Sequence, residues 1–297
     1  MRRTYLSHAS HVVLNGVSQV FLQTNRACGL LILVAIALYA PSLLAGTLLG
    51  LLSGTFAAHG LGYERHDIET GLYGYNPTLL GLLITLVLGP SALALLLVVI
   101  AGTLSSLLQR RLLRLMRERG GPAVLTLAFV LFGWLTLTLA GVLDVVTEAR
   151  LPESDVDGWG ALGAIASGIG QVVFLAEPEA GCCVLLAVLI ADRRAGLWAL
   201  CGSAIGVYSA LLGGATESQA LAGLVGYNPA LAALALSQVH RNALIPALGI
   251  ALAVGCQLVF GHLGIPPLTM PFILACWAVG LGTKRVRPQA ETRFVGG

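Results

Sequence analysis

Charged residues are scarce in this chain. Asp, Glu, Lys and Arg make up only 10% of its 297 residues, whereas hydrophobic residues make up 57%. A soluble domain usually carries about 25% charged residues. The composition therefore excludes an ordinary soluble domain, and the net charge of +3 does not indicate a nucleic-acid partner.

Other signals are missing as well. The first residues lack the apolar segment and the small-residue cleavage site of a signal peptide. The six Cys residues fall inside apolar segments without CxxC spacing, which favours small apolar side chains over disulfides or metal ligands. No nucleotide-binding loop and no nucleophile with a matching base is present. The sequence therefore predicts neither an ATP-driven pump nor an enzyme, and no cofactor.

Long apolar runs fill the chain instead. A helix needs about 20 apolar residues to cross a bilayer, and the runs that begin at Ala27 and Ala123 have that length. The sequence therefore predicts an all-α polytopic membrane protein, embedded in a lipid bilayer, with about ten transmembrane helices. The apolar segments divide equally between two halves of the chain: 27–40, 43–58, 78–88, 91–108 and 123–146, then 180–191, 196–213, 230–239, 243–260 and 268–283.

The two halves repeat each other. The stretch GLYGYNPTL from Gly71 returns 152 residues later as GLVGYNPAL from Gly223, with seven of nine positions identical. At the same offset, GVSQV with Gln19 matches GIGQV with Gln171. A third pair, LTLAF and LTMPF, follows near the end of each half. Three matched pairs in the same order indicate an internal duplication, because chance similarity would explain one pair but not three.

Five segments in each half is an odd number. The second half, 151–297, is therefore predicted to lie upside down relative to the first half, 1–150. With a cytoplasmic N-terminus and Gln stretches that dip in and return, every Lys and Arg except Arg150 falls on the cytoplasmic side, as the positive-inside rule requires. Both termini are then cytoplasmic, Gln109 lies inside and Ser154 lies outside.

The basic run RRLLRLMRER is interpreted as part of this topology signal, with lipid or partner binding as the alternative. Irregular backbone at membrane depth survives only where it is buried or lines a cavity. The Gln stretches and the GYNP breaks recur in both halves. They therefore predict short pore helices that meet head to head near the midplane.

Polar residues of the repeated segments are the candidate pore residues. Gln19 and Gln171 each supply one acceptor and two donors, and Thr126 and Thr269 add hydroxyl groups. Each has a structural alternative, because Gln can join helices and Thr can bond the backbone of its own helix. The Asn of each GYNP motif is interpreted mainly as a turn former.

Ionisable residues are nearly absent from the predicted spans, where Asp144 near the end of one is the exception. Proton- and Na⁺-coupled transporters usually keep such residues inside the membrane. The lining therefore favours uncoupled flow of a small, flat, neutral solute that forms hydrogen bonds. A coupled transporter or a sensor-like protein that reuses the fold is the alternative.

The paired motifs resemble those of the urea transporters over nearly the whole chain. The resemblance implies a passive channel for urea in the inner (plasma) membrane: a homotrimer, with one pore per protomer in which dehydrated urea passes in single file. Gln19 and Gln171 would then serve two end sites, and Thr126 and Thr269 would border the middle constriction. The resemblance also implies that slot walls are formed by four further residues: Tyr75, Tyr227, Leu79 and Leu231.

Three positions depart from the family's pattern. The family commonly has Phe three residues after the Gln, which fits Phe174, but Leu22 stands there in the first half. Arg26 and Ala128 stand where the family has prolines. Both Gln and both Thr residues are intact, whereas the aromatic wall of the first-half site is changed. A channel or coupled transporter for other small neutral amides is therefore the alternative function.

Overall fold

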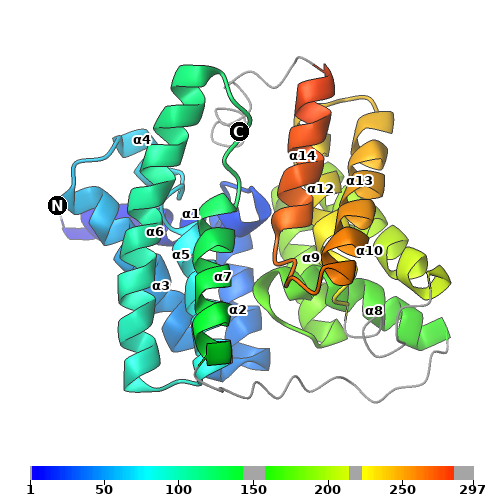
Figure 1. Cartoon of the computed structure of the whole chain (residues 1–297). Coiled ribbons are helices and arrows are strands. Elements are labelled where there is room, and N and C mark those ends of the chain that lie inside the picture. Colours follow the sequence, from blue (N-terminus) through cyan, green and yellow to red (C-terminus); the bar gives the residue numbers. More distant parts are fainter. Residues whose placement is uncertain (1, 143–157, 214–222, 284–297) are drawn as a thin grey trace. The chain divides into compact units, whose positions relative to one another are not determined.

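The computed structural model describes residues 2–142, 158–213 and 223–283, and every regular element within these ranges is a helix (Figure 1). The described residues fall into two compact units, one up to position 142 and one from position 158. Asp144, Arg150 and Ser154, on which part of the predicted topology depends, lie outside the described residues.

The first unit begins with a helix that is interrupted at the Gln stretch, and it continues through the predicted apolar segments. The GYNP motif marks the start of a short helix, as its turn-forming residues predict. In order, its elements are α1 (Arg2–Ser18), η1 (Gln19–Phe21), α2 (Arg26–Tyr39), α3 (Pro41–Gly60), α4 (Arg65–Glu69), α5 (Tyr75–Leu88), α6 (Ala92–Arg119) and α7 (Leu127–Val142).

The second unit follows the same order of elements wherever it is described. It again begins with a helix that ends at the Gln stretch, and its GYNP motif again starts a short helix. Its elements are α8 (Gly158–Gly170), η2 (Gln171–Val173), α9 (Pro178–Ala191), α10 (Arg193–Leu212), α12 (Tyr227–Val239), α13 (Leu244–His262) and α14 (Met270–Thr283).

Several of these helices can cross a membrane. α3, α6, α10 and α13 are long and apolar enough, and two further spans arise if α1 with α2 and α8 with α9 each count as one. These two pairs bend by 78° and 70° at the Gln stretches. The prediction of a helical membrane protein with several spans is thus confirmed. Each predicted apolar segment contains a helix, but α5 and α12 have only 14 and 13 residues. The count of ten crossings therefore stays a prediction.

Small residues let the short helices approach the long ones closely. In the first unit α3 packs against α5, and in the second α10 packs against α12. A β-carbon on Gly50 of α3 would lie 2.2 Å from the carbonyl oxygen of Pro77, and one on Gly202 of α10 would lie 2.4 Å from that of Pro229. Such close approach is typical of helix pairs in membranes, and it seats each GYNP helix deep within its unit.

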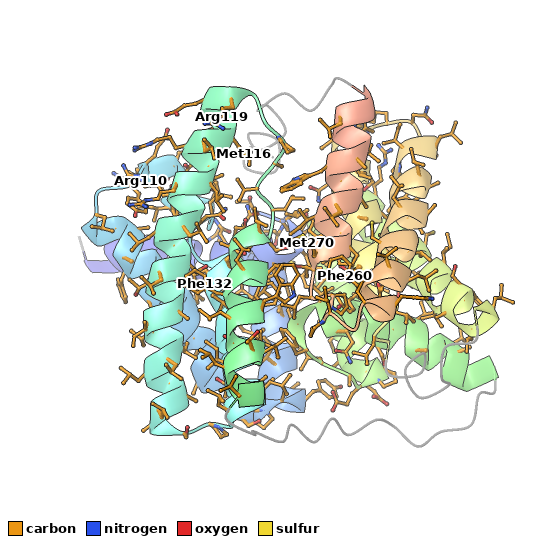
Figure 2. The ribbon with its side chains drawn as sticks, in the orientation of Figure 1. Arg110, Met116, Arg119, Phe132, Phe260 and Met270 are labelled. Carbon is orange, nitrogen blue, oxygen red and sulfur yellow. The ribbon has the colours of Figure 1, made fainter. Side chains whose placement is uncertain are left out.

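α6 extends beyond the apolar segment predicted at 91–108. It continues for 28 residues through the basic run and ends at Gly120, whose left-handed backbone lets its N–H bond the carbonyl of Met116. Leu, Arg, Met and Glu are all strong helix formers, so the basic run remains helical. Arg110, Met116 and Arg119 lie along this final third of α6 (Figure 2).

Candidate functional site

The first Gln stretch forms a tight turn. α1 ends at Ser18, and the single 3-10 turn η1 begins with Gln19, which is 1% exposed. The Nε2 of Gln19 donates a hydrogen bond to Thr24 Oγ1 at 2.9 Å. Ser18 Oγ donates to the carbonyl of Gln23 at 2.6 Å and closes the turn. The amide of Gln19 is therefore held with its nitrogen toward Thr24.

Gln171 has the same place in the second unit. It begins η2 directly after α8, and it is half-buried. Each Gln turn ends at a residue in the left-handed conformation: Leu22 (φ 55°, ψ 31°) and Phe174 (φ 60°, ψ 29°). The N–H of each of these residues bonds the carbonyl of the Gln three positions earlier. The next N–H, of Gln23 or Leu175, bonds the carbonyl of Ser18 or Gly170 at 3.1 Å, and the two bonds together make a Schellman motif.

Glycine usually takes the left-handed position of such a motif, because a β-carbon is strained there. Backbone conformations of this kind cluster at functional sites. Leu22 thus adopts the same backbone conformation as Phe174. The neighbouring Phe21 does not supply the aromatic residue expected at the end of the turn, because Phe21 lies within η1 and is only 1% exposed.

The departure at Arg26 leaves the Gln turn intact. Asn25 caps α2 by accepting a hydrogen bond from the N–H of Cys28 at 3.1 Å. Arg26 is then the first helical residue, as Pro178 is in α9. Proline is favoured at this position because the N–H there has no partner within the helix. An arginine is also accommodated there, because its side chain is exposed.

The GYNP turn of each unit packs against the helix that leads to the Gln. Gly71 has a φ of 87° and Gly223 has a φ of 71°. A β-carbon on Gly71 would lie 2.5 Å from the backbone of Asn15, and one on Gly223 would lie 2.4 Å from the backbone N of Gly168. Only glycine satisfies both requirements. The Gln and GYNP motifs are therefore adjacent within each unit.

The first two residues of α5 hold the turn that carries Thr126. Tyr75 donates its hydroxyl hydrogen to the carbonyl of Leu125. The Oδ1 of Asn76 accepts a hydrogen bond from the N–H of Phe129 at 3.1 Å. Thr126 lies between these two attachment points, directly before α7, and is 2% exposed. The GYNP motif thus positions the Thr segment as well as the Gln segment.

The second unit has the same attachment. Tyr227 donates to the carbonyl of Leu268 at 2.8 Å, and Asn228 Oδ1 accepts from the N–H of Phe272 at 3.2 Å. Thr269 follows directly and precedes α14. Both Thr residues therefore stand where a helix begins.

A second pair of glutamines joins these contacts, and the sequence did not mark either of them as a site residue. Gln109 on α6 is 1% exposed, donates to the hydroxyl of Tyr75 at 2.9 Å and accepts from Asn76 Nδ2 at 3.1 Å. Gln257 on α13 accepts from Asn228 Nδ2 at 3.4 Å. The available signal was a Gln in or directly after the fourth apolar segment of each half, since Gln257 lies within 243–260 and Gln109 follows 91–108. Gln109 faces the interior of its unit, so it cannot report which side of the membrane α6 ends on.

Leu79 and Leu231 are each 1% exposed. Each lies four residues after the Tyr of its GYNP motif and so shares a helix face with it. The structure therefore brings together, within each unit, the Gln turn, the GYNP turn with its Tyr and Leu, and the Thr turn. The meeting of the two units around one pore stays a prediction. In the described ranges no group of three His, Cys, Asp or Glu side chains could hold a metal ion.

A match to a family model decides the identity of the chain. The model described as urea transporter covers residues 10–284, a range that includes both Gln turns, both GYNP motifs and both Thr turns. The chain belongs to the urea transporter family. Proteins named urea transporter 1 from sheep (Ovis aries), goat (Capra hircus) and rat (Rattus norvegicus) are each 29% identical to it over 293 residues, covering 89% of this chain and 74% of the relative.

Membership of the urea transporter family confirms the resemblance drawn from the paired motifs. The family consists of transporters rather than enzymes. A transporter acts within a membrane, and the long apolar helices of this chain fit that environment. The chain is therefore a membrane protein.

Proposed function

We propose that this chain conducts urea passively across the plasma (inner) membrane, through a single-file pore between its two halves. Family membership supports urea as the solute, since the family and the sheep and goat relatives are named for it. The observation that carries the mechanism is the recurrence, in both units, of a Gln turn and a Thr turn fastened to one GYNP helix.

The two halves, 1–150 and 151–297, are proposed to lie inverted in the membrane. Equivalent short helices then point at each other from opposite sides, as in transporters built from inverted repeats. Support comes from the basic residues, which fall on one side in this topology. Both termini are then cytoplasmic. The protein assembles as a homotrimer with one pore in each protomer, as the resemblance to the family implies.

Urea requires a lining of acceptors. It is planar, with four N–H donors and one carbonyl, and each donor that loses its water without replacement costs about 1–3 kcal/mol. Gln19 and Gln171 offer side-chain carbonyls at two end sites, and Thr126 and Thr269 offer hydroxyls at the centre. Short helices add carbonyl oxygens at their ends, because these groups have no partner within the helix.

Flat apolar walls select a flat solute. We assign these walls to the side chains that flank the polar positions: Tyr75, Tyr227, Leu79, Leu231, Leu22 and Phe174. The bonds of Tyr75 and Tyr227 to the Thr turns hold their rings in fixed positions, which suits a rigid slot.

One observation favours a second candidate function. Leu22 adopts the backbone conformation that Phe174 adopts in the other unit, so the first-half site has an aliphatic wall where the second has an aromatic one. A softer wall admits solutes that differ slightly in shape from urea. Transport of other small neutral amides, such as formamide or acetamide, is therefore the alternative.

Flux into proteoliposomes tests the proposal. Urea entry should follow its own gradient and should not change when a pH or Na⁺ gradient is imposed, because the charged residues in the described ranges lie toward helix ends and connections. Accumulation of urea above its outside concentration would contradict passive conduction. Faster entry of acetamide than of urea would favour the second candidate.

A further inference from the structure

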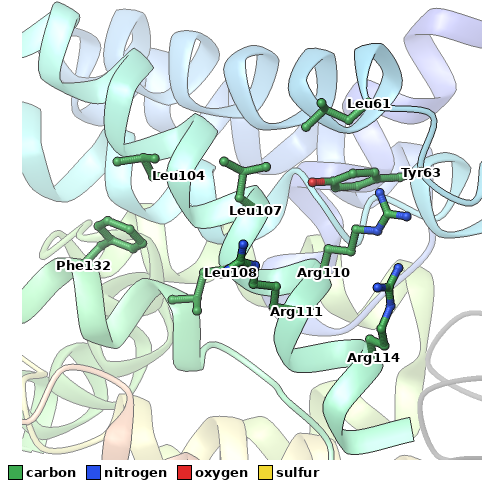
Figure 3. Close-up of a pocket in the computed structure, with 9 residues that line it drawn as sticks. All are labelled: Leu61, Tyr63, Leu104, Leu107, Leu108, Arg110, Arg111, Arg114 and Phe132. Atoms are coloured by element: carbon green, nitrogen blue, oxygen red, sulfur yellow. The ribbon is translucent and has the colours of Figure 1, made fainter. Parts of the chain in front are cut away.

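A cleft on the first unit lies beside the basic run of α6, apart from the Gln, GYNP and Thr turns. It has a volume of about 630 Å³ and is formed by the segment directly after α3, the second half of α6 and the side of α7 (Figure 3). Its lining changes character from one end to the other: Leu61, Tyr63, Leu104, Leu107, Leu108, Arg110, Arg111, Arg114 and Phe132.

One end of the cleft is apolar. Leu104 and Phe132 lie together there, away from Arg110 and Arg114 (Figure 3). Leu104 is 44% exposed, and it lies on α6, which is long and apolar enough to cross a membrane. An exposed leucine within such a span meets acyl chains rather than water.

The other end is basic. The guanidinium of Arg110 lies 4.0 Å above the centre of the Tyr63 ring, a cation–π contact that holds it in place. Arg111 and Arg114 are exposed and follow Leu104 and Leu107 along the same face of α6. In the part of the chain that the structure describes, neither of them has a carboxylate within ion-pair distance, and no acidic residue lines the cleft.

Arg117, by contrast, has its charge paired with carboxylates of the same unit. Arg117, one turn further along α6, binds Asp67 through both of its terminal nitrogens at 3.1 Å and lies 3.7 Å from Glu64. Its charge is therefore neutralised within the protein. Arg111 and Arg114 instead present their charge at the mouth of an apolar cleft.

We propose that this cleft binds one molecule of an anionic phospholipid. The α-helix rises 1.5 Å per residue, so Leu104 and Arg114 lie about 15 Å apart along α6. An acyl chain fits along Leu104, Leu107 and Phe132 while the phosphate reaches the guanidinium groups. Guanidinium forks match phosphate oxygens, and basic pockets at this depth attract anionic head groups. The charge of the mouth and its distance from the apolar end both select a lipid over a neutral solute.

The test uses two matched variants of the full-length protein. Arg111→Gln with Arg114→Gln removes the two unpaired charges and leaves Arg110 on its ring. The control, Arg119→Gln with Arg241→Gln, removes as many charges at exposed positions outside the cleft. Binding of dioleoyl phosphatidylglycerol and of dioleoyl phosphatidylcholine to the delipidated protein is measured by native mass spectrometry in a neutral detergent.

Phosphatidylglycerol should bind at one site in the wild type and in the control. It should bind about 30-fold more weakly to the Arg111/Arg114 variant. Each arginine near an anionic lipid surface contributes about 1 kcal/mol of binding free energy, and the loss of two such contributions corresponds to about that change in affinity. Leu104→Gln should weaken it as well, whereas Leu97→Gln, at an exposed leucine of α6 outside the cleft, should not.

Three results would overturn the proposal. The first is equal affinity for phosphatidylcholine. The second is displacement of the lipid by inorganic phosphate at matched concentration, because the site would then be one for a free anion. The third is a loss of subunits from the assembly in the Arg111/Arg114 variant, because the cleft would then be a contact between copies of the chain.

Discussion

The hydroxyl of Tyr75 donates a hydrogen bond to the backbone carbonyl of Leu125, which lies 50 residues later in the chain. Tyr227 makes the equivalent bond to Leu268 at 2.8 Å. Both acceptor residues hold left-handed backbones, with φ values of 50° and 42°, directly before the Thr residues. The GYNP motif is thus an internal clamp that holds the Thr turn in a conformation it would not adopt alone.

Removing this hydroxyl should destabilise the first unit. Tyr75→Phe leaves the buried carbonyl of Leu125 and the amide of Gln109 without this partner. A buried group left unsatisfied costs about 1–3 kcal/mol, so the unfolding midpoint of the solubilised protein should fall. Tyr208→Phe is the control, because Tyr208 is 53% exposed on α10. Equal midpoints for Tyr75→Phe and the control would show that the clamp contributes nothing.

The contact between each GYNP turn and the helix before the Gln should tolerate substitution even less. Gly71→Ala and Gly223→Ala each place a β-carbon about 2.5 Å or less from backbone atoms, at a positive φ. Backbone cannot move aside as a flexible side chain can, so both variants should lose the monodisperse peak in size-exclusion chromatography. Gly141→Ala on α7, where a β-carbon meets nothing within 4 Å, should elute as wild type. A normal peak for Gly71→Ala would refute the tight contact.

Much of this arrangement could be predicted from the sequence. Hydrophobic runs predicted the helices, because an apolar segment in a bilayer must satisfy its backbone internally. The duplicated motifs predicted which segments are equivalent, since Gln19, Gly71 and their partners recur at one offset. Glycine in each GYNP motif predicted a break, and the structure has a turn there.

The rest depends on contacts between segments far apart in the chain. Nothing local to Gln109 distinguishes a buried network residue from the first residue of a cytoplasmic loop, because its partners Tyr75 and Asn76 lie over 30 positions away. The left-handed backbone of Leu22 could not be predicted from the sequence for a related reason. Leucine is a strong helix former, and only the Schellman bonds of the folded turn overcome that preference.

The predicted topology can be tested by labelling single cysteines in whole cells. The exposed Cys182 and Cys201 are first replaced by Ser. Ser154→Cys should then react with an impermeant maleimide added outside, because its acidic segment is predicted to be external. Glu118→Cys, at the exposed end of α6, should react only after permeabilisation. The reverse pattern would place the termini outside.

The two end sites give the sharpest prediction about transport. Gln19→Leu and Gln171→Leu keep similar bulk but remove the carbonyl that we assign to a urea N–H. Urea must then enter with a donor unpaired, at a cost of about 1–3 kcal/mol. If this cost falls on the highest barrier, the rate drops about 5- to 150-fold, since 1.36 kcal/mol is a factor of ten. Stopped-flow urea flux, divided by the amount of folded protein, measures the change.

A matched glutamine separates a pore role from a packing role. Gln238→Leu makes the same change near the end of α12, at a half-buried position away from the Gln and Thr turns, and it should leave urea flux at the wild-type level. Water permeation should fall less than urea flux in both end-site variants, because water needs no planar amide site. If Gln19 and Gln171 only pack helices together, replacing them would lower stability while the flux per folded protein stayed unchanged. That result in both variants would remove the glutamine pair from the pore.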